Sequence, residues 1–201
     1  MIIFLEKGGI LVIPILLCSV FTVAIFLERI ITYSRLRIRG AGLAEKIAGL
    51  LMQGKKGEAQ KAAKESNSPM GRVLAKAIEV QDHDREILET VLVNSMDEEV
   101  RNLSTYVQTL ATIGNIAPLL GLLGTVIGMI KAFMVIQQMG GKVNAAVLAG
   151  GIWEAMLTTA LGLAVALPTM VAHSYLLSRI DSYEARLQNG SVTFMKAVTR
   201  K

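Results

Sequence analysis

Residues 151–163 read GIWEAMLTTALGL, so one carboxylate, Glu154, and two adjacent hydroxyls, Thr158 and Thr159, lie inside an otherwise apolar run. From Val143 to Leu177 the only other acidic or basic residue is His173. About 20 apolar residues are enough for a helix to cross a bilayer, so this run predicts a membrane-spanning helix. A carboxylate is costly there and by default faces a bundle interior or a water path. Glu154 is therefore the first candidate for an ion pathway.

Charge is segregated along the whole chain. Of the 201 residues, 52% are hydrophobic and 18% are charged, which is too apolar for an ordinary soluble domain. Residues 10–27, 102–130 and 143–178 carry almost no charge, whereas residues 28–101 carry most of it. This pattern predicts an all-α integral membrane protein with three transmembrane helices and one soluble region.

The order of these segments gives a topology. The predicted parts are a short interfacial helix plus the first span (1–31), a cytoplasmic helical loop (32–101), the second span with a cytoplasmic extension (102–139), a periplasmic turn (140–144), the third span (145–178) and a cytoplasmic helical tail (179–201). Four arginines follow the apolar run 10–27, at positions 29, 35, 37 and 39. By the positive-inside rule that end is cytoplasmic, so the N-terminus lies outside and the C-terminus inside. The first span lacks a basic n-region and a cleavage site, which indicates an uncleaved anchor.

The soluble region reads as short helices. Apolar residues recur at helical spacing from Leu43 to Leu51, and Ser68-Pro69 has the residues of a helix N-cap and first helical position. Four lysines, Lys55, Lys56, Lys61 and Lys64, form a basic face that is either a solvated helix surface or a contact with lipid headgroups. From Asp84 no turn signal appears until Gly140-Gly141, which predicts one long helix running into the second span.

Each of the last two spans carries a face of small residues. At 100° per residue, one face of the second span contains Gly114, Ala117, Gly121, Thr125, Gly128 and Ala132, and one face of the third contains Gly151, Ala155, Thr159, Gly162, Ala166, Thr169 and His173. Such faces serve either close helix packing or a pore, and threonine hydroxyls bond back to their own helix or to a water chain. Glu154 favours the pore, because packing needs no carboxylate. Pro118 and Pro168 are candidate helix kinks.

Several function classes are disfavoured. No Walker loop, GxGxxG, paired-cysteine motif, H-E-x-x-H or nucleophile elbow occurs, so we expect no enzyme activity, no catalytic residues, no cofactor and no metal site. The basic residues lie mainly beside membrane segments, which points to membrane lipids and not to nucleic acid. Cys18 is the only cysteine, so no intrachain disulfide forms. A membrane bundle with a buried acid would instead draw on a transmembrane ion gradient.

Residues 117–129 (APLLGLLGTVIGM), 151–156 (GIWEAM) and 158–168 (TTALGLAVALP) together resemble the ExbB/TolQ branch of the MotA/TolQ/ExbB family. The resemblance implies a proton channel subunit of the bacterial inner (cytoplasmic) membrane. It implies a homopentamer around two helices of an ExbD/TolR-type partner, each with an aspartate, delivering work through a TonB- or TolA-like protein. By motif position, Thr125 and Thr159 would line the channel and Glu154 would be the acid near its outer end. This chain has His173-Ser174 where relatives often have Tyr-Asn.

Two other functions stay open on the sequence. The flagellar stator branch has four spans and a larger cytoplasmic region, which fits less well. A non-conducting membrane scaffold is the alternative from a different class. Within the ExbB/TolQ branch, the role is TonB-linked uptake, Tol-type envelope maintenance or a specialised version of these.

Overall fold

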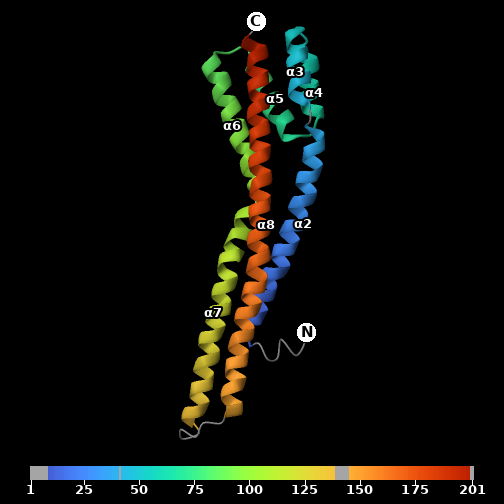
Figure 1. Cartoon of the computed structure of the whole chain (residues 1–201). Coiled ribbons are helices and arrows are strands. Elements are labelled where there is room, and N and C mark those ends of the chain that lie inside the picture. The colour runs from blue at the N-terminus through green and yellow to red at the C-terminus, as the bar shows by residue number, and fades with distance from the viewer. Residues whose placement is uncertain (1–8, 41, 139–144, 200–201) are drawn as a thin grey trace. The chain divides into compact units, whose positions relative to one another are not determined.

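The computed structural model describes residues 9–40, 42–138 and 145–199, and all of the regular structure in these ranges is helical (Figure 1). The helices are α2 (Val12–Arg39), α3 (Leu43–Met52), α4 (Lys56–Glu65), α5 (Pro69–Glu79), α6 (Arg85–Ser104), α7 (Val107–Gln138) and α8 (Ala145–Thr199). The predicted all-α class is confirmed. The predicted interfacial helix at the chain start and the turn at 140–144 lie outside the described residues.

Three helices have the length and composition of membrane spans. The candidate spans are Val12–Leu36, Val107–Gln138 and Leu148–Thr199. At 1.5 Å per residue, the 32 residues of α7 extend about 48 Å, against about 30 Å of hydrocarbon. The second and third apolar helices therefore continue beyond a bilayer, as the sequence predicts.

The chain divides into two compact units, and the first contains residues 1–27 and 106–175. In this unit α7 and the first part of α8 run antiparallel, with Gly114 beside Met170 at one end and Gly151 beside Ala132 at the other (Figure 1). The first part of α2 runs parallel to α8. The ring of Phe26 meets that of Tyr175 edge to face, with centroids 6.4 Å apart.

The second unit contains residues 28–105 and 176–201, and it has a core of its own. The core combines α3, α4, α5, α6 and the end of α8, from which Leu187 and Phe194 are fully buried. Burial of a side chain such as Phe194 contributes roughly 1.5–3 kcal/mol, which explains why α8 continues to Thr199.

The start of α5 follows from the sequence. Ser68 has an extended backbone, and its hydroxyl accepts the N–H of Gly71 at 3.1 Å, while Pro69 occupies the first helical position. The predicted N-cap is therefore confirmed. Gly71 is also required for space, because a Cβ there would overlap the hydroxyl of Ser66 and lie close to the carbonyl oxygen of Ala63.

The prediction of one long helix from Asp84 to the second span is wrong. The helix stops at Ser104, and α7 begins only at Val107, because Thr105 is extended and Tyr106 has a left-handed backbone with φ 63°. The hydroxyls of Ser104 and Thr105 donate hydrogen bonds to the carbonyl oxygens four residues earlier, of Val100 and Arg101 respectively. Such bonds compete with helix continuation.

Candidate functional site

The carboxylate of Glu154 is paired within the chain. It lies on α8 with 25% of its side chain exposed, and the Nζ of Lys131 on α7 donates to its Oε1 at 2.8 Å. In the sequence, Lys131 is the only Asp, Glu, Lys or Arg between Arg101 and Lys142, and Glu154 is the only one between Lys142 and Arg179. The two isolated charges of the last two apolar helices therefore meet.

The chain just before α2 also reaches this carboxylate. Gly9 has φ +66°, and a Cβ built on it would overlap Oε1 of Glu154. Residue 9 therefore has to be glycine for two reasons, its backbone conformation and the space that the carboxylate occupies. Residues from two other stretches of sequence, Lys131 and Gly9, therefore lie against this carboxylate.

The two small-residue faces pack against each other inside one chain. A Cβ on Gly162 would lie 2.6 Å from the carbonyl oxygen of Ala117, and one on Gly121 would lie 2.9 Å from Cα of Thr159. Near the Glu154 end, a Cβ on Gly128 would lie 3.0 Å from Cβ of Ala155. All seven residues predicted for packing or a pore are buried, namely Gly114, Ala117, Gly121, Gly128, Ala155, Gly162 and Ala166. They bring α7 and α8 to backbone contact, while a pore role stays a prediction.

The three candidate threonines lie in different settings. Thr158 is buried, and its hydroxyl donates to the carbonyl of Ala155 at 2.8 Å. The hydroxyl of Thr159 donates across to the carbonyl of Gly121 at 3.0 Å. Thr125 is half-buried and donates to the carbonyl of Leu122 on its own helix at 2.6 Å. Their role in a channel stays a prediction.

A buried hydroxyl pair joins α2 to α8. The Oγ1 atoms of Thr22 and Thr169 are 3.0 Å apart, and Thr169 itself donates to the carbonyl of Val165, so Thr22 is the donor between them. The sequence pattern predicts Thr169 on the small-residue face, whereas Thr22 was not predicted as a site residue. The available signal was a single threonine in the middle of the apolar run 10–27.

The two candidate kinks and His173 all lie within long helices. Pro118 and Pro168 each lie inside a helix that continues on both sides, α7 and α8 respectively. His173 is half-buried on α8, one turn beyond Thr169.

Each lysine of the basic face in the second unit has a carboxylate neighbour. Lys55 pairs with Glu58, Lys56 with Asp82, Lys61 with Glu65 and Lys64 with Glu79. These pairs are exposed, so each contributes little to stability. Local neutralisation favours a solvated helix surface over a headgroup contact.

Two charge contacts join α5 to α6, and one of them has a buried carboxylate. Arg72 donates from Nε to Oε1 of Glu99 at 2.7 Å and from a terminal nitrogen to Oε2, and this hydrogen bonding raises the pKa of Arg72 above its ordinary value. Glu99 is buried, with 7% of its side chain exposed. On the surface nearby, the hydrogen bond from Lys76 at 2.6 Å lowers the pKa of Glu98.

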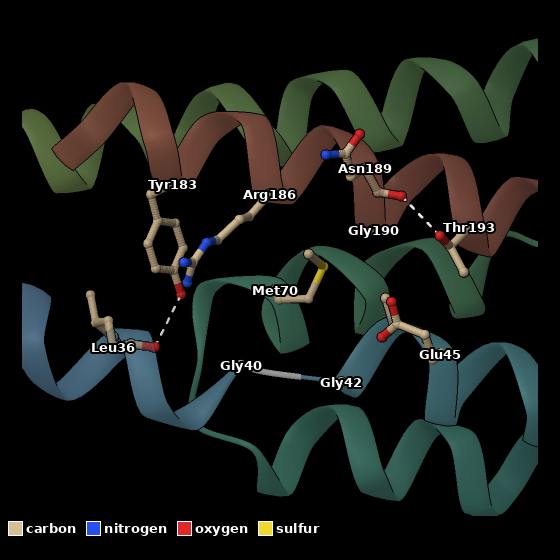
Figure 2. Close-up of a pocket in the computed structure, with 11 residues that line it drawn as sticks. Leu36, Gly40, Gly42, Glu45, Met70, Tyr183, Arg186, Asn189, Gly190 and Thr193 are labelled. Atoms are coloured by element: carbon tan, nitrogen blue, oxygen red, sulfur yellow. Dashed lines mark hydrogen bonds between the residues drawn. The ribbon is translucent and has the colours of Figure 1, made fainter. Parts of the chain in front are cut away.

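A pocket of about 350 Å³ lies in the second unit between the end of α2, the start of α3 and α8 (Figure 2). Arg186 and Tyr183 lie toward Leu36 on one side, and Glu45 lies on the other, with Met70 between them. Two of its hydroxyls are already used, because Tyr183 donates to the carbonyl of Leu36 at 3.4 Å and Thr193 donates to that of Asn189 at 3.0 Å. The pocket wall therefore ties α2 to α8.

Comparison with known proteins supplies the family. Residues 65–189 match the sequence pattern of the MotA/TolQ/ExbB proton channel family, and this range contains Glu154, Lys131 and the three candidate threonines. The chain belongs to this family. Its isolated charge pair, Lys131 and Glu154, lies inside the matched region.

Individual relatives place the chain in the ExbB/TolQ branch. It is 30% identical over 82% of its length to the putative biopolymer transport protein ExbB-like 3 of Synechocystis, of which 79% is covered. It is 41% identical over 50% of its length to the biopolymer transport protein ExbB of Pseudomonas putida, and 37% identical over 45% to the Tol-Pal system protein TolQ of Haemophilus influenzae. The matched stretch spans 30% and 39% of those two relatives.

Proposed function

We propose that this multi-pass membrane protein is the channel-forming subunit of an ion-motive-force-driven motor. In this proposal, protons cross the bacterial inner membrane along a path that includes Glu154, and the complex performs work on the cell envelope. The role is transport and energy transfer without enzymatic catalysis.

One observation carries the proposal. Glu154 is the only Asp, Glu, Lys or Arg between Lys142 and Arg179, lies within the family match and keeps a quarter of its side chain exposed in a single chain. An ionisable group kept inside a membrane span marks an ion path or a buried partner. Membership of a proton channel family favours the ion path.

The assembly follows the same reasoning. We propose a homopentamer that encloses two helices of an ExbD/TolR-type single-span protein and acts on a TonB- or TolA-like protein. Relatives named ExbB and TolQ support both branches of this proposal, energised transport and envelope maintenance. Many large apolar side chains on α7 and α8 are exposed in the single chain, among them Leu119, Phe133 and Trp153, and these supply surface for lipid, further copies and partners.

The test replaces the carboxylate by its amide. The chain is co-expressed with an ExbD/TolR-type protein, reconstituted into liposomes with an internal pH dye, and exposed to a pH gradient. Glu154→Gln should assemble normally and lose proton flux, because an amide keeps the shape but cannot exchange a proton. Glu89→Gln, an exposed carboxylate on α6, is the control and should keep full flux. A conducting Glu154→Gln variant would remove Glu154 from the ion path, whereas a wild-type complex without proton flux would favour a non-conducting scaffold.

A further inference from the structure

We infer that Lys131 is the resident counter-ion of Glu154 and a positioning residue for ion transfer. This inference rests on the proposed function and adds a residue to it. Each of the two residues is the only Asp, Glu, Lys or Arg of its apolar stretch. The 2.8 Å separation of Lys131 Nζ from Glu154 Oε1 is that of a charge-assisted hydrogen bond.

The pair is fixed by the backbone around it. Gly128 packs on Ala155, and Gly151 packs on Ala132, where a Cβ on Gly151 would lie 2.7 Å from Cβ of Ala132. Lys131 precedes Ala132 on α7, and Glu154 precedes Ala155 on α8. Because these contacts allow no shift of one helix along the other, they hold the two charges opposite each other.

Gly9 limits where the carboxylate can go. Its backbone lies against Oε1, the same oxygen that accepts the hydrogen bond from Lys131. A side chain at residue 9 would push the carboxylate out of the pair. The chain just before α2 therefore helps to determine how Glu154 is held.

The pairing gives ion transfer a defined local consequence. When a proton adds to a carboxylate oxygen of Glu154, the group becomes neutral, and Lys131 keeps its own proton but loses its partner. When that proton leaves, the carboxylate regains its charge and the pair forms again. An unpaired charge is unfavourable in an apolar setting, so each proton would alternately loosen and restore the contact between α7 and α8.

The test compares Lys131→Met, Lys131→Arg, Glu154→Gln and the Lys131→Met/Glu154→Gln double variant in the full complex. Two properties are measured, proton flux in liposomes and the midpoint of thermal unfolding in detergent. Lys131→Met should lower flux by about tenfold or more, equivalent to a barrier change of about 1.4 kcal/mol, whereas Lys131→Arg keeps the charge and should retain most of the flux. The double variant should lower the midpoint of thermal unfolding by less than the sum of the decreases in the two single variants, because each single variant leaves one charge unpaired.

The outcomes separate this inference from the proposed function. If Glu154→Gln abolishes flux while Lys131→Met conducts normally, the counter-ion inference is wrong and the proposed function stands. If Glu154→Gln conducts, the proposed path through Glu154 fails, whatever the flux of Lys131→Met. Strict additivity of the unfolding shifts would also overturn the inference, because it would mean that the two side chains do not interact.

Substitution of Gly9, which lies against the carboxylate of Glu154, provides an independent check. Gly9→Ala should lower flux in the same direction as Lys131→Met, since the new methyl group displaces Oε1. The control is Gly150→Ala, one turn from Glu154 on α8, where a Cβ would meet no atom within 4 Å. Equal, undiminished flux in both alanine variants would contradict the described site.

Discussion

The hydroxyl of Thr159 on α8 donates to the carbonyl oxygen of Gly121 on α7 at 3.0 Å. The absence of a side chain on Gly121 allows this approach, since a Cβ there would lie 2.9 Å from Cα of Thr159. The bond satisfies a hydroxyl inside an apolar segment and links two helices where their backbones lie close together. It makes Thr159 part of the helix interface as well as a candidate for the ion path.

Glycine-to-alanine substitutions on α8 should have opposite effects at two positions. At Gly162 the new Cβ would lie 2.6 Å from the carbonyl oxygen of Ala117, so the helices must separate, and overpacking typically costs about 1–3 kcal/mol. At Gly150 the Cβ meets nothing within 4 Å, and alanine should be neutral or stabilise by up to about 1 kcal/mol. Thermal unfolding measures both. A Gly162→Ala variant as stable as Gly150→Ala would contradict the helix contact.

The Arg72–Glu99 contact predicts a second stability difference. Glu99→Gln should lower the free energy of unfolding by about 1–2 kcal/mol, because charged hydrogen bonds contribute about 1.5–3 kcal/mol and Arg72 is half exposed to water. The matched control is Glu89→Gln on the same helix, whose pair with Arg85 is exposed and should matter little. Chemical denaturation followed by circular dichroism compares the two. Equal losses would show that burial of Glu99 is unimportant.

The lowered pKa of Glu98 predicts a pH dependence. A carboxyl whose pKa is lower in the folded state adds stability that is fully present above the unfolded pKa, about 4.3, and is lost as the pH falls through the folded pKa. The gap in unfolding midpoint between the wild type and Lys76→Met should therefore stay constant from neutral pH down to about pH 5 and shrink below about pH 4. A gap that does not change with pH would mean that Lys76 acts by packing alone.

Hydropathy and charge segregation predicted the three spans, because each apolar run is long enough to cross the hydrocarbon of a bilayer as a helix. The N-cap at Ser68 was predictable because the serine-proline pair acts locally. Glu154 stood out for the same reason as the spans, as an isolated charge. Lys131 is equally isolated, but its place beside Glu154 depends on the antiparallel register of α7 and α8, which the periodicity of a single helix does not contain.

Other features depend on contacts that no local pattern reports. Gly9 and Glu154 are distant in sequence, and glycine near an apolar run looks like an ordinary helix boundary. The break at Thr105 and Tyr106 contains neither glycine nor proline, the usual signals for the end of a helix. Tyr106 instead adopts a left-handed backbone conformation, which is uncommon for residues other than glycine. The Thr22–Thr169 contact needs the parallel pairing of α2 with α8, which hydropathy does not supply.

The topology predicted from the sequence places the end of α7 outside and residues 32–101 and 179–201 inside. In a background in which Cys18 is replaced by serine, Gln138→Cys should react with an impermeant maleimide in intact cells of a strain with a permeabilised outer membrane. Lys61→Cys and Lys196→Cys, both on exposed positions, should react only after the inner membrane is opened. The reverse pattern would invert the orientation that the arginines after the first span predict.

Valine substitutions should separate the transport role of the threonine hydroxyls from their structural role. Valine matches the shape of threonine and deletes the hydroxyl, and hydrogen bonds in membranes contribute only about 0.6 kcal/mol on average, so assembly should survive. Thr159→Val removes a bond between helices, whereas Thr125→Val removes a bond to the carbonyl of Leu122 on its own helix. If both hydroxyls line the ion path, both variants should reduce proton flux while co-purifying normally with the single-span partner. Thr112→Val is the control, because this exposed residue of α7 also bonds to its own helix, through the carbonyl of Gln108 at 3.1 Å. Wild-type proton flux in all three variants would limit Thr125 and Thr159 to helix packing.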